Sequence, residues 1–366
     1  MKKITSLLLL LNIAITFSQN GAPATPYYNG FNWNLTGTNL KTALATKITN
    51  THTHQLNYSQ TDEALAIVDL DPADATHTNV LLVYGFSSNL CPDASADDKD
   101  HRRRDSSMQD DGTANPCLWN REHTFPKALG DPDLGTTGPG ADLHHLRAAD
   151  KKRNADRDND KYFNGTGNSF ESGTNWYPGD EWKGDVARMM MYMYLRYGTQ
   201  CLPTTVGVGT PVASDANMID LFLQWNADDP VTQFEDNRNT YVGNASNTYG
   251  QGNRNPFIDN PYLATVIWGG PVAQNRWPTI FLATPTFDLD NAVSIYPNPS
   301  SNVVNISTSV SLDEIDVITI NGQVLQQIKN PVIESNIYTI SNLPKGFYFL
   351  KLSTSTSSVT KKVLIN

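Results

Sequence analysis

The spacing of apolar residues divides the chain before residue 284 into helical and extended segments. Leu40, Leu44 and Ile48 recur every three to four residues, which predicts a helix over 36–48 with Thr36 as its N-cap. Short continuous apolar runs are typical of buried strands. The same criteria predict the other elements of this region: helices over 185–197 and 215–225, and strands over 64–68 and 80–84.

The pattern changes near residue 284, where short alternations of Val, Ile, Ser and Thr begin. This part contains no Trp, His or Cys, and Asn321-Gly322 is typical of a hairpin turn between two apolar runs. We therefore predict a linker over 284–291 and a small β-sandwich over 292–366. Its predicted strands cover 303–307, 314–320, 348–352 and 361–366.

The chain begins with the features of an export signal. Two lysines precede an apolar stretch over 7–17, and the small residue Ser18 suits a cleavage site. We predict that residues 1–18 are a signal peptide, that 19–283 form the main domain, and that the protein is exported through the periplasm. After the signal, no apolar run reaches the roughly 18 residues that a membrane span needs.

Composition and charge narrow the class of protein. With 39% hydrophobic and 17% charged residues, the 366-residue chain has the composition of a globular protein of about two domains. Its formal net charge of −10 argues against a protein that coats nucleic acid by bulk charge. A local basic cleft remains compatible with that charge.

The three cysteines are Cys91, Cys117 and Cys201. Export implies an oxidising compartment in which a disulfide is plausible, but the sequence leaves the pairing open and one thiol over. Their wide spacing, without any C-x-x-C, argues against a structural zinc ribbon.

Two polar segments, 120–126 (NREHTFP) and 142–159, carry the candidate chemistry. Phosphodiester hydrolysis needs a base for water, a divalent cation, and positive side chains that hold phosphate. His123 can be the base because an imidazole titrates near neutral pH. Glu122 and Asn154 offer the hard oxygen ligands that suit Mg²⁺. Because neighbouring strand residues point to opposite faces, Glu122 and His123 can serve one site only at a strand end or bulge.

In this order, the motifs resemble the secreted endonuclease I family, whose members carry a ββα-metal (His-Me finger) active site. The resemblance covers most of residues 27–268. Its matching motifs are Arg121-Glu122-His123-x-x-Pro126, Asp142-Leu-His-His-Leu146, Asn154-x-x-Arg157-x-Asn159, and the segments 183–188, 229–231, 238–239 and 252–259.

The resemblance implies a role for each matched residue. His123 corresponds to the general base, and Glu122 and Asn154 correspond to the ligands of Mg²⁺, with Ca²⁺ or Mn²⁺ as alternative ions. Arg157 matches a basic position that orients or pairs with the phosphate. Family members cleave DNA, and often RNA, with little sequence preference, and they leave 5′-phosphate ends.

The neighbouring polar residues are expected to assist this site. Arg121, Lys152 and Arg153 would add positive charge for substrate binding, although the two helical cations also suit a solvated helix face. Asp142 and His144 would support the site from behind. Asn159 competes with Asn154 as a ligand, but the register of the family motif favours Asn154 and leaves Asn159 a stabilising role.

The tail resembles the C-terminal sorting domain of the type IX secretion system. The resemblance rests on Tyr296-Pro-Asn-Pro299, Asn321-Gly-Gln323, Leu343-Pro-Lys-Gly-Phe-Tyr348 and the closing Lys-Lys-x-Leu-Ile. It implies the type IX machinery as a partner and a secreted or outer-surface location.

Two other functions fit parts of the sequence. A zinc hydrolase could use Glu122, His123, His144 and His145, but the helical H-E-x-x-H that it needs is absent. A non-catalytic adhesin delivered by the tail would leave the ordered motifs without a role.

We therefore predict an α+β fold, with a ββα-metal nuclease core, surrounding helices and a C-terminal β-sandwich. We expect it to act as a monomer on DNA, and on RNA as well.

Overall fold

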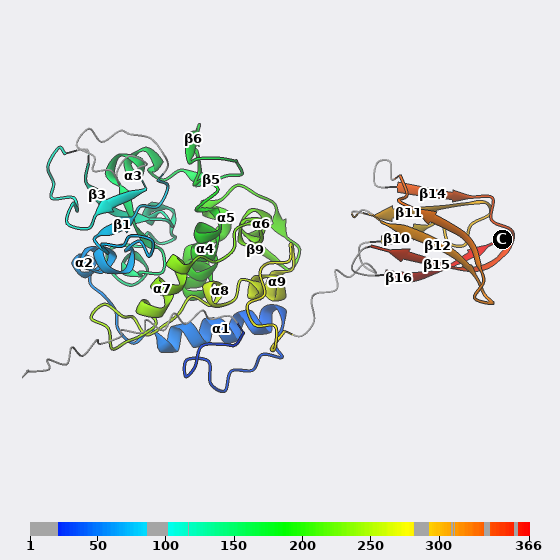
Figure 1. The fold of residues 1–366 in the computed structure, drawn as a ribbon, viewed down its shortest axis with the longest axis horizontal. Helices are drawn as coiled ribbons and strands as arrows, with labels where there is room; N and C mark the ends of the chain where they lie inside the picture. The colour runs from blue at the N-terminus through cyan, green and yellow to red at the C-terminus, as the bar shows by residue number, and fades with distance from the viewer. Residues whose placement is uncertain are drawn as a thin grey trace, which may run out of the picture. The chain divides into compact units, whose positions relative to one another are not determined.

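The computed structural model describes residues 21–85, 102–115, 117–281, 293–308, 310, 312–332, 337–354 and 358–366. The chain divides after Phe281 into two compact units (Figure 1), which we describe separately. The predicted signal peptide over 1–18 and the predicted linker over 284–291 lie outside the described residues.

The first unit mixes helices with short strand pairs, which agrees with the predicted α+β class. None of its described helices is long and apolar enough to cross a membrane. Its helices and strands in chain order are α1 (Gly37–Thr51), α2 (Tyr58–Val68), β1 (Asn79–Leu81), β2 (Arg103–Asp105), β3 (Trp119–His123), η2 (Lys127–Leu129), η3 (Gly138–Ala141), β4 (Leu146–Asp150), α3 (Lys151–Arg157), β5 (Lys161–Tyr162), β6 (Phe170–Ser172), β7 (Asn175–Tyr177), α4 (Lys183–Tyr197), η4 (Gly198–Cys201), α5 (Pro203–Val206), β8 (Pro211–Val212), β9 (Asp215–Ile219), α6 (Asp220–Asp228), α7 (Gln233–Val242), α8 (Pro256–Asp259) and α9 (Tyr262–Trp268).

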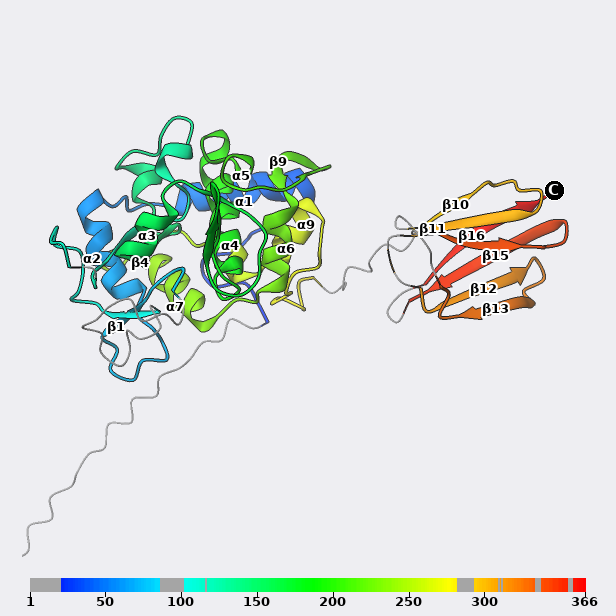
Figure 2. The same ribbon diagram turned by 90° about the horizontal axis from the view of Figure 1, so that it is seen from above.

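Helix α4 forms the centre of this unit, with α1 and α6 packed against it (Figure 2). Its residues are buried from Gly184 through Leu195, so its methionines, Tyr192 and Tyr194 are core, as the sequence predicts, and Tyr197 is partly buried against that core. Gly184 permits a close approach, because a Cβ there would lie 2.6 Å from the carbonyl oxygen of Asp229. The absence of a side chain therefore sets how near the helix lies to the segment that follows α6.

Two predicted elements differ from the structure. Residues 64–68 are helical and form the end of α2, since a short apolar run cannot by itself distinguish a strand from a buried helix. The helix begins at a capping box in which Asn57 and Gln60 satisfy each other's backbone N–H groups. The predicted helix over 215–225 is instead strand β9 followed by α6.

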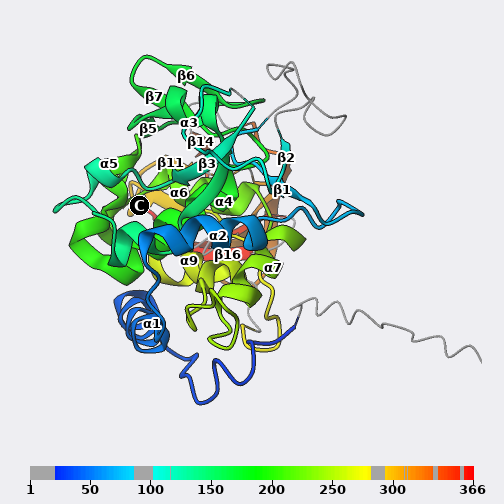
Figure 3. The same cartoon turned by 90° about the vertical axis from the view of Figure 1, so that its left-hand side faces the viewer.

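Strands β3 and β4 and helix α3 form a strand–strand–helix unit. The strands pair antiparallel, with His123 opposite Leu146 and Trp119 opposite Asp150. Asp150 ends β4 and caps α3, because its carboxylate accepts hydrogen bonds from the backbone N–H groups of Lys152 (2.9 Å) and Arg153 (3.0 Å). Helix α2 lies against both strands (Figure 3). This arrangement brings residues 119–123 beside residues 151–157.

The structure describes two of the three cysteines. Cys117 is disulfide-bonded, whereas Cys201 is a free and buried thiol. Cys91 lies outside the described residues. The structure therefore removes Cys201 from the pairings that the sequence leaves open.

The second unit consists of two antiparallel sheets around one apolar core. Three strands, in the order β10-β11-β14, face four strands in the order β13-β12-β15-β16. Inward residues of both sheets, such as Ile306, Val317 and Leu350, form a single buried cluster. These strands are β10 (Val293–Tyr296), β11 (Val303–Thr308), β12 (Glu314–Thr319), β13 (Val324–Lys329), β14 (Ile337–Ser341), β15 (Gly346–Ser353) and β16 (Ser358–Ile365).

The separate cores predict that the two units unfold independently. Leu350→Ala should destabilise only the second unit, by about 2–5 kcal/mol, because it leaves a cavity in that core. Leu263→Ala, at a buried position of α9, should destabilise only the first unit. Hydrogen exchange followed by mass spectrometry measures both units, and tryptophan fluorescence reports the first alone, since the tail has no Trp. Loss of protection in both units after either substitution would contradict the prediction.

Candidate active site

The alternation of β3 sends its polar side chains to two sides of the hairpin. Arg121 and His123 contact Tyr58 at the beginning of α2. Glu122, between them, points to the other side, where it meets Tyr84 and Arg157. His123 is the last residue of β3, so the glutamate and the histidine stand at a strand end, as the sequence argument requires.

Glu122 is a buried carboxylate with two polar neighbours. Its side chain is 3% exposed, and its Oε1 accepts a hydrogen bond of 2.9 Å from the hydroxyl of Tyr84. The Nη1 atom of Arg157 lies 3.4 Å from the same oxygen. Burial raises the pKa of Glu122, while the charge of Arg157 and the hydrogen bond from Tyr84 oppose that rise. These contacts hold the carboxylate of Glu122, a possible oxygen ligand for a metal, in a fixed position.

His123 is held as a neutral imidazole. Its Nε2 lies 3.1 Å from the carbonyl oxygen of Gly140. A carbonyl only accepts, so Nε2 carries the hydrogen and Nδ1 keeps the lone pair. Burial, with the nearby His145, lowers the pKa of His123 to about 2. The histidine is therefore unprotonated at neutral pH and can accept a proton.

Asn154 faces β3 from helix α3. Its Nδ2 donates to Oδ1 of Asn120 (2.8 Å) and to the carbonyl oxygen of Arg121 (3.1 Å). These two bonds fix the amide and leave its Oδ1 without a hydrogen-bond donor among the residues that the structure describes. The amide oxygen is thus placed next to the backbone that carries Glu122.

Glu122 and Asn154 suit a hard divalent cation. Both offer oxygen, and Mg²⁺ usually keeps several waters and takes few protein ligands. Within the described ranges, no group of three or more His, Cys, Asp or Glu residues could hold a metal ion. The histidines of the alternative zinc site are engaged elsewhere: Nε2 of His144 meets the carbonyl of Asn253 (3.0 Å), and Nε2 of His145 meets that of Pro139 (2.7 Å). The zinc alternative is therefore not assembled here.

Arg157 does not occupy the position expected of a phosphate ligand. Its side chain is 1% exposed. It donates to the carbonyl oxygens of His123 (3.3 Å) and Thr124 (3.0 Å), in addition to its contact with Glu122. The guanidinium therefore holds the end of β3 from within the fold, and its burial leaves a phosphate no access.

The other expected substrate-binding cations already have partners. Arg121 donates to Asp62 at 2.8 Å and lies over the ring of Tyr58. Lys152 is exposed and pairs with Asp156 at 2.7 Å, which is a solvated helix face. Arg153 is buried and donates to the carbonyl and hydroxyl oxygens of Ser169. Partners remote in the sequence or one helical turn away take up these charges, and the roles of the three cations in substrate binding stay predictions.

The expected supporting residues divide into two groups. Asp142 is fully buried and accepts hydrogen bonds of 2.8 Å from the hydroxyls of Tyr192 and Tyr197. His144 packs on Tyr192, and burial lowers its pKa to about 4. Both lie in the connection between β3 and β4. Asn159 is exposed, and its Nδ2 donates only to its neighbour Asp158, so it does not support the site.

Sequence reasoning missed Tyr58, Tyr84 and Lys127. Tyr84 reaches the site because Val83 pairs with Ala149 of β4. It has φ +68, a backbone conformation that is uncommon outside glycine and often occurs at functional sites. No local motif marks Tyr58 or Tyr84, whereas Lys127 directly follows Pro126 and could have been noticed.

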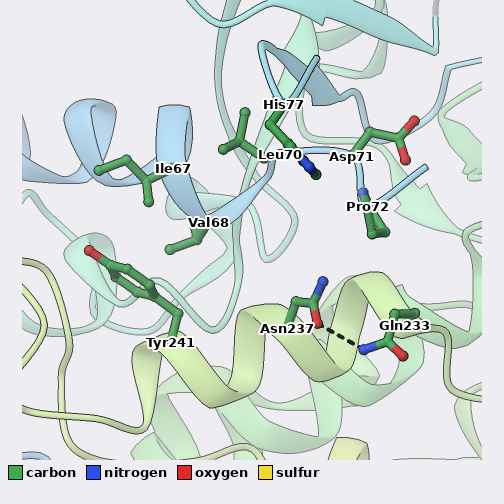
Figure 4. A pocket seen from close by; sticks show the side chains of 9 residues that line it. All are labelled: Ile67, Val68, Leu70, Asp71, Pro72, His77, Gln233, Asn237 and Tyr241. Carbon is green, nitrogen blue, oxygen red and sulfur yellow. Dashed lines mark hydrogen bonds between the residues drawn. The ribbon is translucent and has the colours of Figure 1, made fainter. Parts of the chain in front are cut away.

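A cavity of about 460 Å³ lies between the end of α2 and α7 (Figure 4). Ile67, Val68 and Tyr241 form its apolar side, and Gln233 and Asn237 contribute amides. Glu122, His123 and Asn154 do not line it. The candidate site is therefore separate from this cavity.

The strand–strand–helix unit thus places the glutamate, histidine and asparagine of the expected motif on β3 and α3. Residues 36–262 match the family described as Endonuclease I, and this chain belongs to that family. It is similar to "Extracellular ribonuclease" of Bacillus amyloliquefaciens, with 38% identity over 63% of this chain and 74% of the relative. It is also similar to "Extracellular ribonuclease" of Bacillus subtilis (strain 168), with 36% identity over 68% of this chain and 82% of the relative. The protein is thus a nuclease, a hydrolase.

Residues 294–366 match the secretion system C-terminal sorting domain, so the chain is a secreted or outer-surface protein. The chain is also similar to a solved DUF3244 family protein from Bacteroides vulgatus with an immunoglobulin-like β-sandwich fold. The sequence identity is 19%, and the match covers 21% of this chain. The match covers 88% of that protein at a TM-score of 0.19.

The buried position of Arg157 predicts a large effect on stability. Arg157→Ala should destabilise the first unit by about 3–5 kcal/mol, because it leaves the carboxylate of Glu122 buried without its cation. Lys152→Ala, which removes an exposed pair within the same helix, should change stability by no more than about 0.5 kcal/mol. Urea unfolding followed by tryptophan fluorescence measures both. Equal unfolding midpoints for the two variants would show that Arg157 is not buried as described.

Proposed function

We propose that this nuclease hydrolyses phosphodiester bonds in both RNA and DNA and that His123 takes the proton of the attacking water. The observation that supports this role is the hydrogen bond between Nε2 of His123 and the carbonyl of Gly140. It leaves Nδ1 of a neutral ring as the proton acceptor. The names of the two bacillary relatives support RNA as a substrate.

In this proposal a divalent cation, Mg²⁺ in the first instance, is held by the carboxylate of Glu122 and Oδ1 of Asn154. Such an ion would offset the negative charge that develops on the phosphate and on the leaving oxygen. Tyr84 and Arg157 hold the carboxylate, and the bonds from Asn154 to Asn120 and Arg121 orient the amide.

The proposed nucleophile decides the range of substrates. Water attacks the phosphorus, its proton passes to Nδ1 of His123, and the bond to the 3′ oxygen breaks. The leaving 3′ oxygen takes a proton from solvent water and becomes a hydroxyl. The product keeps a 5′-phosphate. The 2′-hydroxyl of ribose takes no part in this sequence of bond changes, so the same residues serve RNA and DNA.

The first test is the loss of the base. His123→Ala should lower kcat on RNA and on supercoiled plasmid by about 10²–10⁴-fold, the usual contribution of general base catalysis. The matched control is His77→Asn, because His77 lines the separate cavity beside α2 and asparagine tolerates its φ of +53. Cleavage is measured on gels with the full chain. An active His123→Ala protein would exclude His123 as the base.

The second test concerns the metal. Calorimetric titration with Mg²⁺ or Mn²⁺ should show binding that Glu122→Gln and Asn154→Ala each weaken at least about tenfold, since the first removes the charge of a ligand and the second removes an oxygen ligand. Excess EDTA should abolish cleavage by the wild-type protein. Full activity in EDTA would contradict the metal requirement. Unchanged titrations of both variants would place the ion elsewhere.

A further inference from the structure

On the side of the hairpin that faces α2, the ring of Tyr58 contacts three charged or polar groups. The Tyr58 ring stacks on His123, with centroids 5.9 Å apart and an interplanar angle of 22°. The guanidinium carbon of Arg121 lies 3.5 Å from the centre of the same ring. Nζ of Lys127, from η2, lies 5.2 Å from it. Tyr58 therefore gathers two cations next to the proposed base.

These two cations differ in their partners. Arg121 donates to Asp62, to the Thr61 hydroxyl and to the Tyr58 carbonyl, so its charge and its hydrogen-bonding capacity are used within the fold. Lys127 forms no ion pair or side-chain hydrogen bond with any residue that the structure describes. Among the described residues, its ammonium meets the π-face of Tyr58, and its hydrogen-bond donors stay available for a ligand.

The other cations near the hairpin are engaged. Arg157 and Arg153 are buried. Lys151 pairs with Asp110 at 2.8 Å, and Lys152 pairs with Asp156 at 2.7 Å. A protein of net charge −10 repels a polyanion at long range, so a phosphate needs a local cation. Among the residues described around His123, Lys127 fulfils that need.

We propose that Lys127 is a substrate-binding residue whose ammonium donates to a phosphate oxygen of the nucleic acid, while Tyr58 positions both Lys127 and His123. This inference rests on the proposed function. It assigns the substrate's phosphate to a residue outside the Arg121, Lys152 and Arg153 set that the sequence favours. A single contact of this kind binds the strand at one phosphate and does not require positive charge over a large surface.

The dependence of kcat/KM on salt concentration tests this proposal. It changes if Lys127 contacts a phosphate and stays the same if Lys127 has only a structural role. Each phosphate contact to a single strand contributes about −0.7 to the slope of log affinity against log salt concentration. For a single-stranded RNA oligonucleotide at fixed Mg²⁺, Lys127→Met should make the slope of log kcat/KM against log [NaCl] shallower by about 0.7. At low salt, kcat/KM should fall about tenfold, with the larger change in KM. Lys127→Arg should retain the wild-type slope.

The matched control is Lys47→Met on α1. Nζ of Lys47 lies 4.7 Å from the ring of Tyr27, again without a carboxylate partner among the described residues, so the local environment is similar. Figure 1 shows α1 along the lower edge of the unit and β3 at its upper left. Lys47→Met should keep both the wild-type slope and the wild-type activity.

The outcomes separate this inference from the proposed function. A wild-type protein that cleaves neither RNA nor DNA would overturn the proposed function itself. An active wild type whose salt slope is unchanged in Lys127→Met would overturn only the role of Lys127. Thermal unfolding of the variants checks their fold, and Lys127→Gln provides a second neutral variant if Lys127→Met proves unstable. An equal loss of slope in Lys47→Met would also exclude a local contact.

Discussion

The buried contact between Arg157 and Glu122 is the constraint on which the rest of the site depends. A carboxylate removed from water needs a cation and hydrogen bonds, or it becomes protonated. Arg157 provides the charge and Tyr84 a hydroxyl. The same guanidinium holds the carbonyls of His123 and Thr124. One side chain thereby fixes a potential metal ligand and the backbone of the proposed base, which explains why it is not available to the substrate.

The first unit uses its arginines mainly for folding. Several of them pair with carboxylates that would otherwise be buried without a cation, and the removal of either partner of such a pair is costly. This use of positive charge inside an acidic protein leaves few cations at the surface of the site. In the proposed function, the site binds a polyanion through local contacts and through any bound metal. The buried pairs include Arg104–Asp150, Arg147–Asp185, Arg188–Glu235, Arg238–Asp69 and Arg254–Asp259.

Local pattern was a good guide wherever the information lies within a few residues. The core helix α4 and the alternating strands of the tail follow from their periodicity, and the order of the polar motifs led to the family. The pattern failed at 64–68, where a capping box seven residues upstream turned an apolar run into a helix. The placement of His123 at the end of β3 follows from the motif and from the alternation of a strand.

The sequence by itself determined the residue types of the site, the family and the β-sandwich, because these depend on local spacing and on the order of motifs. The tertiary structure decided which charges remain available. Arg121, Lys152 and Arg153 are equivalent to Lys127 as letters in a sequence, but only Lys127 is left without a carboxylate or hydrogen-bond partner among the described residues of the site. Likewise, Tyr84 meets Glu122 across 38 positions of the chain. Burial and long-range contacts set charge, tautomer and access, and no short segment encodes them.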